Sequence, residues 1–134
     1  HFLVRAFLAD GIDEVMAHMT AIEAALGLEI DHMRKLRPKP DPHPKLSATE
    51  RVSARIGAAL TDAKAAENYK DLFELRSAFV HGRAGLPKIS TTQRVLARNL
   101  ARRVARALVA LAVHRTRSRA DVLDDLLRQG IAYL

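Results

Sequence analysis

An arginine and a histidine stand five positions apart in the stretch LRSAFVHG, residues 75–82. A guanidinium can hold a phosphate group and stabilise negative charge that develops on it. A histidine can take up or release a proton near neutral pH. If Arg76 and His81 meet in one cleft, they could bind a phosphate and move a proton. This pair is the main candidate for chemistry in the chain.

Arg76 lies within the apolar face of a helix that we predict over residues 66–80. The apolar members of that face are Tyr69, Leu72, Phe73, Phe79 and Val80. At ~100° per residue, Arg76 falls near the centre of the face, where desolvation of a guanidinium is costly unless an acceptor receives it. We therefore expect Arg76 to be paired, to line a cleft, or to extend its charged end into solvent.

His81 lies ~140° around an ideal helix from Arg76, so the two side chains share a face only if the helix ends between them. Gly82 suits a left-handed cap at this end, where the helix dipole favours the charged form of a histidine. A purely structural interpretation stays open. In it, Arg76 is buried against an acid of the first helix, such as Glu23, and His81 only caps its own helix.

Arginines also recur at four-residue steps along a later predicted helix, residues 90–114. The formal net charge of +7 and the pI of about 10.4 favour a polyanionic partner, of which nucleic acid is the commonest. This ridge is either a track for RNA phosphates or an ordinary solvated face. Aromatic residues make up only 4%, which argues against base recognition by stacking. The candidate RNA contacts are Arg83, Arg94, Arg98, Arg102 and Arg106.

The elements that position these residues are predicted to be helices. The stretches SATE (47–50) and STTQ (90–93) are capping boxes, and RPKPDPHPK (37–45) must be an extended loop because it holds four prolines. No strand is predicted, so the fold class is all-α, a single domain of residues 1–134 folded as a bundle of four or five helices. The expected helices cover residues 12–30, 47–62, 66–80, 90–114 and 118–130.

Several other kinds of site are disfavoured. Asp31, His32, Asp41 and His43 flank the proline-rich loop, but their spacing matches no compact metal site, so we expect an ordinary polar loop. There is no cysteine, phosphate-cradling glycine loop or nucleophile elbow. The longest apolar run, residues 107–113, is far short of the ~20 residues that a membrane span needs. The start, HFLVRAFLADG, lacks an initiator methionine, and we expect the sequence to be part of a longer chain or to have a disordered start.

The stretch YKDLFELRSAFVHGR, residues 69–83, resembles the signature of HEPN domains, especially their Apea-like branch. That signature is an arginine, four to six residues and a histidine, after a helix rich in Tyr and Leu. TAIEAAL (20–26) and ERVSARIGAAL (50–60) are similar to the first and second helices of the branch. The order and spacing match over roughly residues 12–113. Ser77 stands where many active members have asparagine or another strongly polar residue.

The resemblance implies a HEPN-like bundle that forms a homodimer and places two Arg/His motifs across one cleft. The implied activity is that of a metal-independent RNA endonuclease without cofactors, in toxin–antitoxin systems or phage defence in the cytoplasm. Arg76 would hold the phosphate, and His81 would be the general acid or base. Ser77 would orient either the phosphate or His81. Glu23 and Tyr69 would support Arg76. Possible partners are RNA, an antitoxin and other domains of the parent chain.

The alternative within the same family is a non-catalytic HEPN module that binds RNA or another protein. Only the nuclease needs Arg76 and His81 in a cleft that solvent can reach. A helix-turn-helix DNA-binding protein is a third possibility, but no short helix pair with a tight glycine turn and an exposed recognition helix is evident.

Overall fold

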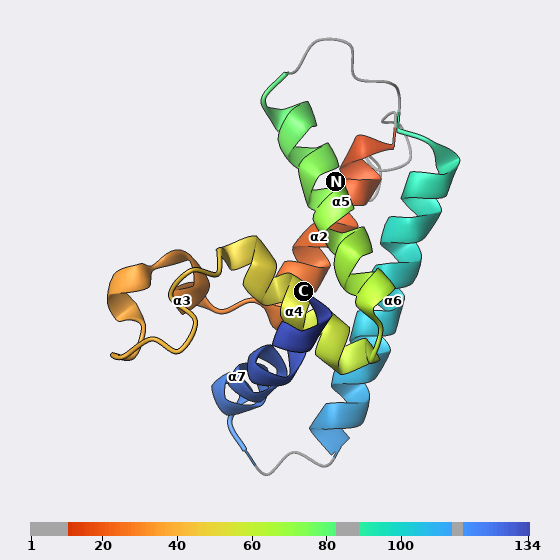
Figure 1. The fold of residues 1–134 in the computed structure, drawn as a ribbon. Helices are drawn as coiled ribbons and strands as arrows, with labels where there is room; N and C mark the ends of the chain where they lie inside the picture. Colours follow the sequence, from red (N-terminus) through yellow and green to blue (C-terminus); the bar gives the residue numbers. More distant parts are fainter. Residues whose placement is uncertain (1–10, 83–88, 114–116) are drawn as a thin grey trace.

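The computed structural model describes residues 11–82, 89–113 and 117–134, and within these ranges the chain is helical without any strand. Figure 1 shows the long helices packed as a bundle, with α3 and the proline-rich loop projecting to one side. The predicted all-α fold class is therefore confirmed. The α-helices are α2 (Ile12–Leu26), α3 (Glu29–His32), α4 (Ala48–Leu60), α5 (Ala63–Val80), α6 (Thr91–Val113) and α7 (Arg119–Gly130). Short 3-10 turns cover Arg34–Leu36 and Ile131–Tyr133.

Both predicted capping boxes begin a helix. At the start of α4, Ser47 Oγ accepts the Glu50 N–H at 3.2 Å, whereas Glu50 Oε1 accepts the Ser47 hydroxyl at 3.1 Å and not the Ser47 N–H, so only half of this box forms. Before α6, Ser90 Oγ accepts the Gln93 N–H at 3.1 Å, and Gln93 Oε1 accepts the Ser90 N–H at 2.9 Å. These contacts satisfy N–H groups that have no partner within the helix. Helix boundaries are therefore well encoded where a cap lies within three residues.

The core forms where α2 packs against α6 and α4 packs against both α5 and α7. Its largest apolar members include Met19, Ile22, Leu26, Ile56, Tyr69, Leu72, Val104 and Leu123. Two residues that we placed on the apolar face of the third predicted helix, Phe79 and Val80, do not face inward, and Leu111 of α6 is exposed as well. Phe79 is 43% exposed, Val80 is 62% exposed and Leu111 is 37% exposed. They lie within the last three residues of α5 and α6.

The first helix is shorter than predicted. The expected helix over residues 12–30 ends at Leu26, because Gly27 and Leu28 adopt extended backbone before α3 begins. Two arginines stabilise this end by donating hydrogen bonds to the last carbonyl groups of the helix. Arg119 donates to Ala24 and Ala25, and Arg55 Nη1 donates to the Leu26 carbonyl at 2.9 Å. These carbonyls have no partner inside the helix, so the arginines add to the hydrogen bond that the Gly27 N–H donates to the Glu23 carbonyl at 2.7 Å.

Helices α4 and α7 approach each other closely at Gly130. The last predicted helix ends at residue 130, and Gly130 is indeed the final residue of α7. Its backbone is right-handed, however, so the glycine is needed for a different reason. A Cβ atom here would lie 1.9 Å from the carbonyl oxygen of Ala54. Because Gly130 has no side chain, α7 can approach the backbone of α4 this closely.

None of the helices in the described ranges combines the length and the apolar character needed to cross a membrane.

Candidate functional site

Arg76 belongs to a small cluster of polar and aromatic side chains between α2 and α5. Its Nη2 donates to Glu23 Oε1 at 2.6 Å, and the Tyr69 hydroxyl donates to the same oxygen at 3.2 Å. The guanidinium also lies 5.1 Å from the centre of the Phe73 ring, within cation–π distance. The Arg76 side chain is 19% exposed, so it is partly desolvated but not sealed. The expected contact between Arg76 and Glu23 is present.

Tyr69 is a hydrogen-bond donor in this cluster. Burial raises the pKa of its phenol well above the ordinary value of 10.0, and the Glu23 carboxylate raises it further. Tyr69 therefore stays protonated at neutral pH and holds the Glu23 oxygen that receives Arg76. Arg76 Nε and Nη1 make no hydrogen bond within the described part of the chain. These two nitrogens are available to an anionic ligand.

A pocket of about 450 Å³ opens beside the cluster. Its walls come from α2, α3, α4 and α5, together with Arg119 at the start of α7. Arg76 is therefore both a partner of Glu23 and a pocket-lining residue. Besides the cluster itself, the lining includes the apolar residues Leu28 and Val52 and the polar residues Glu29, His32 and Thr49.

His81 lies at the end of α5, outside this pocket. Its N–H donates to the Ser77 carbonyl at 3.0 Å, and Gly82 follows with a φ of +60°. The predicted left-handed glycine at this helix end is therefore confirmed. His81 is exposed and Ser77 is half-buried. Arg76 and His81 are thus both within reach of solvent, but they do not line a common pocket in one chain.

The arginine ridge of α6 divides into two parts. Arg94 Nε donates to Glu14 Oε2 at 2.9 Å, and Arg98 Nη2 donates to Glu14 Oε1 at 2.7 Å. The Arg98 hydrogen bond is the main reason that the pKa of Glu14 lies below its ordinary value of 4.5. Arg102 and Arg106 are exposed and make no ion pair with any residue that the structure describes. Arg83 lies outside the described residues.

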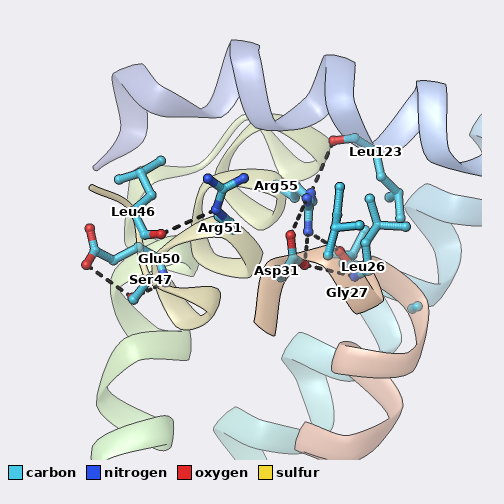
Figure 2. Close-up of polar contacts among 12 residues, drawn as sticks. Leu26, Gly27, Asp31, Leu46, Ser47, Glu50, Arg51, Arg55 and Leu123 are labelled. Carbon is cyan, nitrogen blue, oxygen red and sulfur yellow. Dashed lines mark hydrogen bonds and ion pairs between the residues drawn. The ribbon is translucent and has the colours of Figure 1, made fainter. Parts of the chain in front are cut away.

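A buried ion pair, which sequence reasoning missed, joins α3 to α4. Arg55 Nη1 donates to Asp31 Oδ2 at 2.6 Å and Nη2 donates to Oδ1 at 2.9 Å. Both side chains are completely buried. Figure 2 shows Arg55 between the Leu123 carbonyl of α7 and the Asp31 carboxylate. Asp31 Oδ2 also accepts the Leu28 N–H at 2.8 Å, so this carboxylate fixes the start of α3.

Two more buried arginines fasten the proline-rich loop. Arg51 Nη2 donates to Asp41 Oδ2 at 3.1 Å, and Arg37 Nη1 donates to the same oxygen at 3.4 Å. Burial by itself raises the pKa of the Asp41 carboxyl, but the His43 N–H and Arg51 outweigh it, so the pKa lies below its ordinary value of 3.8. The prediction of an ordinary polar loop was therefore too simple for Asp31 and Asp41. They hold the segment that supplies Leu28 and other pocket residues.

One sequence signal could have revealed this network. In residues 52–60, VSARIGAAL, every residue except Ser53 and Arg55 is small or apolar, so this helix has no polar face on which Arg55 could be solvated. Among the described residues, no group of three or more His, Asp or Glu side chains has the arrangement of a metal site.

Comparisons with family models, curated proteins and solved structures found no match for this chain.

Proposed function

We propose that this chain is a HEPN-type RNA-binding domain that cleaves RNA without a metal ion. The observation that carries the proposal is the state of Arg76, a half-buried guanidinium on a pocket wall with two nitrogens that make no hydrogen bond to any residue the structure describes. A partly desolvated cation is better suited than a fully hydrated one to hold a phosphate and stabilise charge that develops on it. The resemblance of residues 69–83 to the HEPN signature supports the same assignment.

In this mechanism the RNA supplies its own nucleophile. A ribose 2′-hydroxyl attacks the adjacent phosphorus, the bond to the 5′ oxygen breaks, and the products are a 2′,3′-cyclic phosphate and a 5′-hydroxyl. His81 would accept the hydroxyl proton or donate one to the leaving oxygen, and Arg76 would hold the phosphate oxygens. Ser77 would orient the phosphate or the histidine. Glu23 and Tyr69 would keep the guanidinium aimed at the pocket.

A second copy of the chain is part of this proposal. His81 lies outside the pocket that Arg76 lines, so a single chain brings only one of the two groups to the pocket. The neighbours of His81, Phe79 and Val80, are 43% and 62% exposed, which favours an apolar contact at this end of α5. A homodimer formed there would place two copies of the Arg76–His81 motif near each other.

A second candidate function is RNA binding without cleavage. The separation of His81 from the pocket favours this function, as do Arg102 and Arg106, which are exposed on α6. In this case the arginines would contact phosphates, and His81 would be no more than the last residue of its helix turn. Both candidates fit a cytoplasmic role in phage defence or in a toxin–antitoxin pair, with an antitoxin or other domains of the parent chain as partners.

The test is cleavage of mixed RNA in EDTA by the purified chain, with analysis of the product ends. His81→Ala and Arg76→Lys are compared with His43→Ala and Arg34→Lys, which change the same residue types outside the pocket. Cleavage to 2′,3′-cyclic ends that only the first two variants abolish would support the nuclease. RNA binding that weakens with salt, without cleavage, would support the second candidate. If the chain neither binds nor cleaves RNA, both candidate functions are refuted.

A further inference from the structure

The pocket beside Arg76 is lined by both apolar residues and hydrogen-bonding side chains. Its volume of about 450 Å³ lies in the range of about 300–1,000 Å³ that is typical of small-ligand sites. Phe73, Leu28 and Val52 contribute apolar surface, whereas Glu29 and His32 are exposed residues of the same pocket. A flat, partly apolar group with a polar edge matches this lining.

The polar atoms of the pocket lining that make no hydrogen bond with a described residue determine which groups the polar edge of a ligand must carry. Glu23 Oε1 already receives Tyr69 and Arg76, but Glu23 Oε2 makes no hydrogen bond within the described ranges. Glu29 makes no ion pair with a described residue. The pocket therefore offers carboxylate acceptors beside a guanidinium donor. A ligand that satisfies both has an anionic group for Arg76 and N–H donors for a carboxylate.

We propose that this pocket receives one unpaired nucleobase of the RNA, next to the phosphate at Arg76, and that guanine fits it best. Guanine presents two adjacent donors, N1–H and the N2 amino group, which one carboxylate can accept together. Uracil presents only one N–H. Sequence-specific RNA recognition usually reads unstacked bases by such edge contacts. The inference rests on the proposed function, because it assigns the base that neighbours the bound phosphate.

Glu29 is the residue that reads the base, and Arg76 is the residue that holds the phosphate. Glu23 is less suited to reading the base, because its other oxygen is committed to Arg76 and Tyr69. Selectivity would then come from hydrogen bonds at one exposed carboxylate, which agrees with the low aromatic content of the chain. Arg76 would contact the phosphate in the same way whichever of the four bases lies in the pocket.

The experiment measures binding of fluorescein-labelled heptamers of 2′-O-methyl uridine with A, C, G or U at the central position. The methyl group blocks the attacking hydroxyl, so binding is measured without cleavage. The wild-type chain should bind the guanine heptamer about tenfold more tightly than the all-uridine heptamer, the effect of one good bidentate contact. Free guanosine monophosphate should compete only weakly, because it lacks the neighbouring phosphates.

Two variants test the pocket, and one is a control. Glu29→Gln should remove the guanine preference and leave affinity for the all-uridine heptamer unchanged. Ala24→Leu places a larger apolar side chain in the pocket lining and should lower affinity for every heptamer. Glu74→Gln changes an exposed glutamate of α5 that lies outside the pocket, and it should behave as wild type. Circular dichroism establishes that each variant is folded.

The outcomes separate this inference from the function on which it rests. Tight but equal binding of all four heptamers, unaffected by Glu29→Gln, would overturn the base pocket and leave RNA binding intact. Guanosine monophosphate that binds as tightly as the guanine heptamer would assign the pocket to a free nucleotide instead. No binding of any heptamer, together with no cleavage of mixed RNA, would overturn the proposed function itself.

Discussion

Replacement of Arg55 by methionine should destabilise the protein more than any other single change to a charged residue. The substitution would leave the Asp31 carboxylate completely buried, with only the Leu28 N–H as a donor. It would also remove the donor of the Leu26 carbonyl at the end of α2 and an additional hydrogen bond to the Leu123 carbonyl inside α7. Methionine keeps much of the side-chain volume, so the loss is electrostatic rather than one of packing.

The size of the effect follows from these contacts. Removal of one partner from a buried ion pair costs about 3–5 kcal/mol, and the Leu26 carbonyl left without a donor adds up to about 1–3 kcal/mol. These costs overlap, because water can enter and the segment around Asp31 can shift. We expect a loss of about 4–6 kcal/mol, a large part of the roughly 5–15 kcal/mol that stabilises a typical domain. The Tm should fall by roughly 15 °C.

The assay is urea and thermal unfolding followed by circular dichroism, with Arg128→Met as the matched control. Arg128 pairs with Asp125 on the surface, where an ion pair contributes little, so the control should unfold like the wild type. The double variant Arg55→Met with Asp31→Leu removes both charges and should be more stable than Arg55→Met alone. The reasoning would be wrong if Arg55→Met and Arg128→Met melted within about two degrees of each other, or if the double variant were the less stable one.

Three further predictions concern other parts of the molecule. Gly130→Ala should lower the unfolding midpoint strongly, because its Cβ would lie 1.9 Å from a backbone oxygen of α4, whereas Gln129→Ala on the exposed side of α7 should not. The pKa of Glu14 is lowered below 4.5 in the folded state, so its stabilisation is complete above about pH 4.5 and is lost as the pH falls through the folded pKa. Glu14→Gln should therefore show a smaller loss of stability in urea titrations between pH 5.5 and pH 3, and an unchanged loss would contradict the assignment. Arg102→Gln with Arg106→Gln should reduce the slope of log affinity for RNA against log salt by about 1.5, and an unchanged slope would mean that neither side chain contacts a phosphate.

The helices themselves were predictable because their signals are local. Ser47 and Ser90 each begin a helix with partners three residues away, and the apolar periodicity placed Arg76 on a buried face. Its pairing with Glu23 was expected because a desolvated guanidinium needs an acceptor. The position of His81 at the end of α5 followed from Gly82. Interactions over three to five residues are encoded in the spacing of the sequence.

The position of His81 relative to the pocket was not predictable, and neither was the end of α2. Whether two side chains five residues apart share a cleft depends on which other helices cover that part of α5. The end of α2 depends on Arg119, which is 92 residues beyond the Gly27 carbonyl that it also binds. A single glycine in the sequence does not reveal that its backbone will be extended, and a distant arginine cannot be inferred from the spacing of residues 12–30.

The amino-acid sequence by itself thus determined the fold class, most helix starts and the existence of a partly buried arginine, since each depends on neighbours along one helix. Only the tertiary structure decided which charges are buried together. Asp31 and Arg55 are 24 residues apart, and Arg55 and Leu123 are 68 apart. The physical reason is that an ion pair forms where packing excludes water from both partners, and no local pattern specifies which distant carboxylate and carbonyl will meet the same guanidinium.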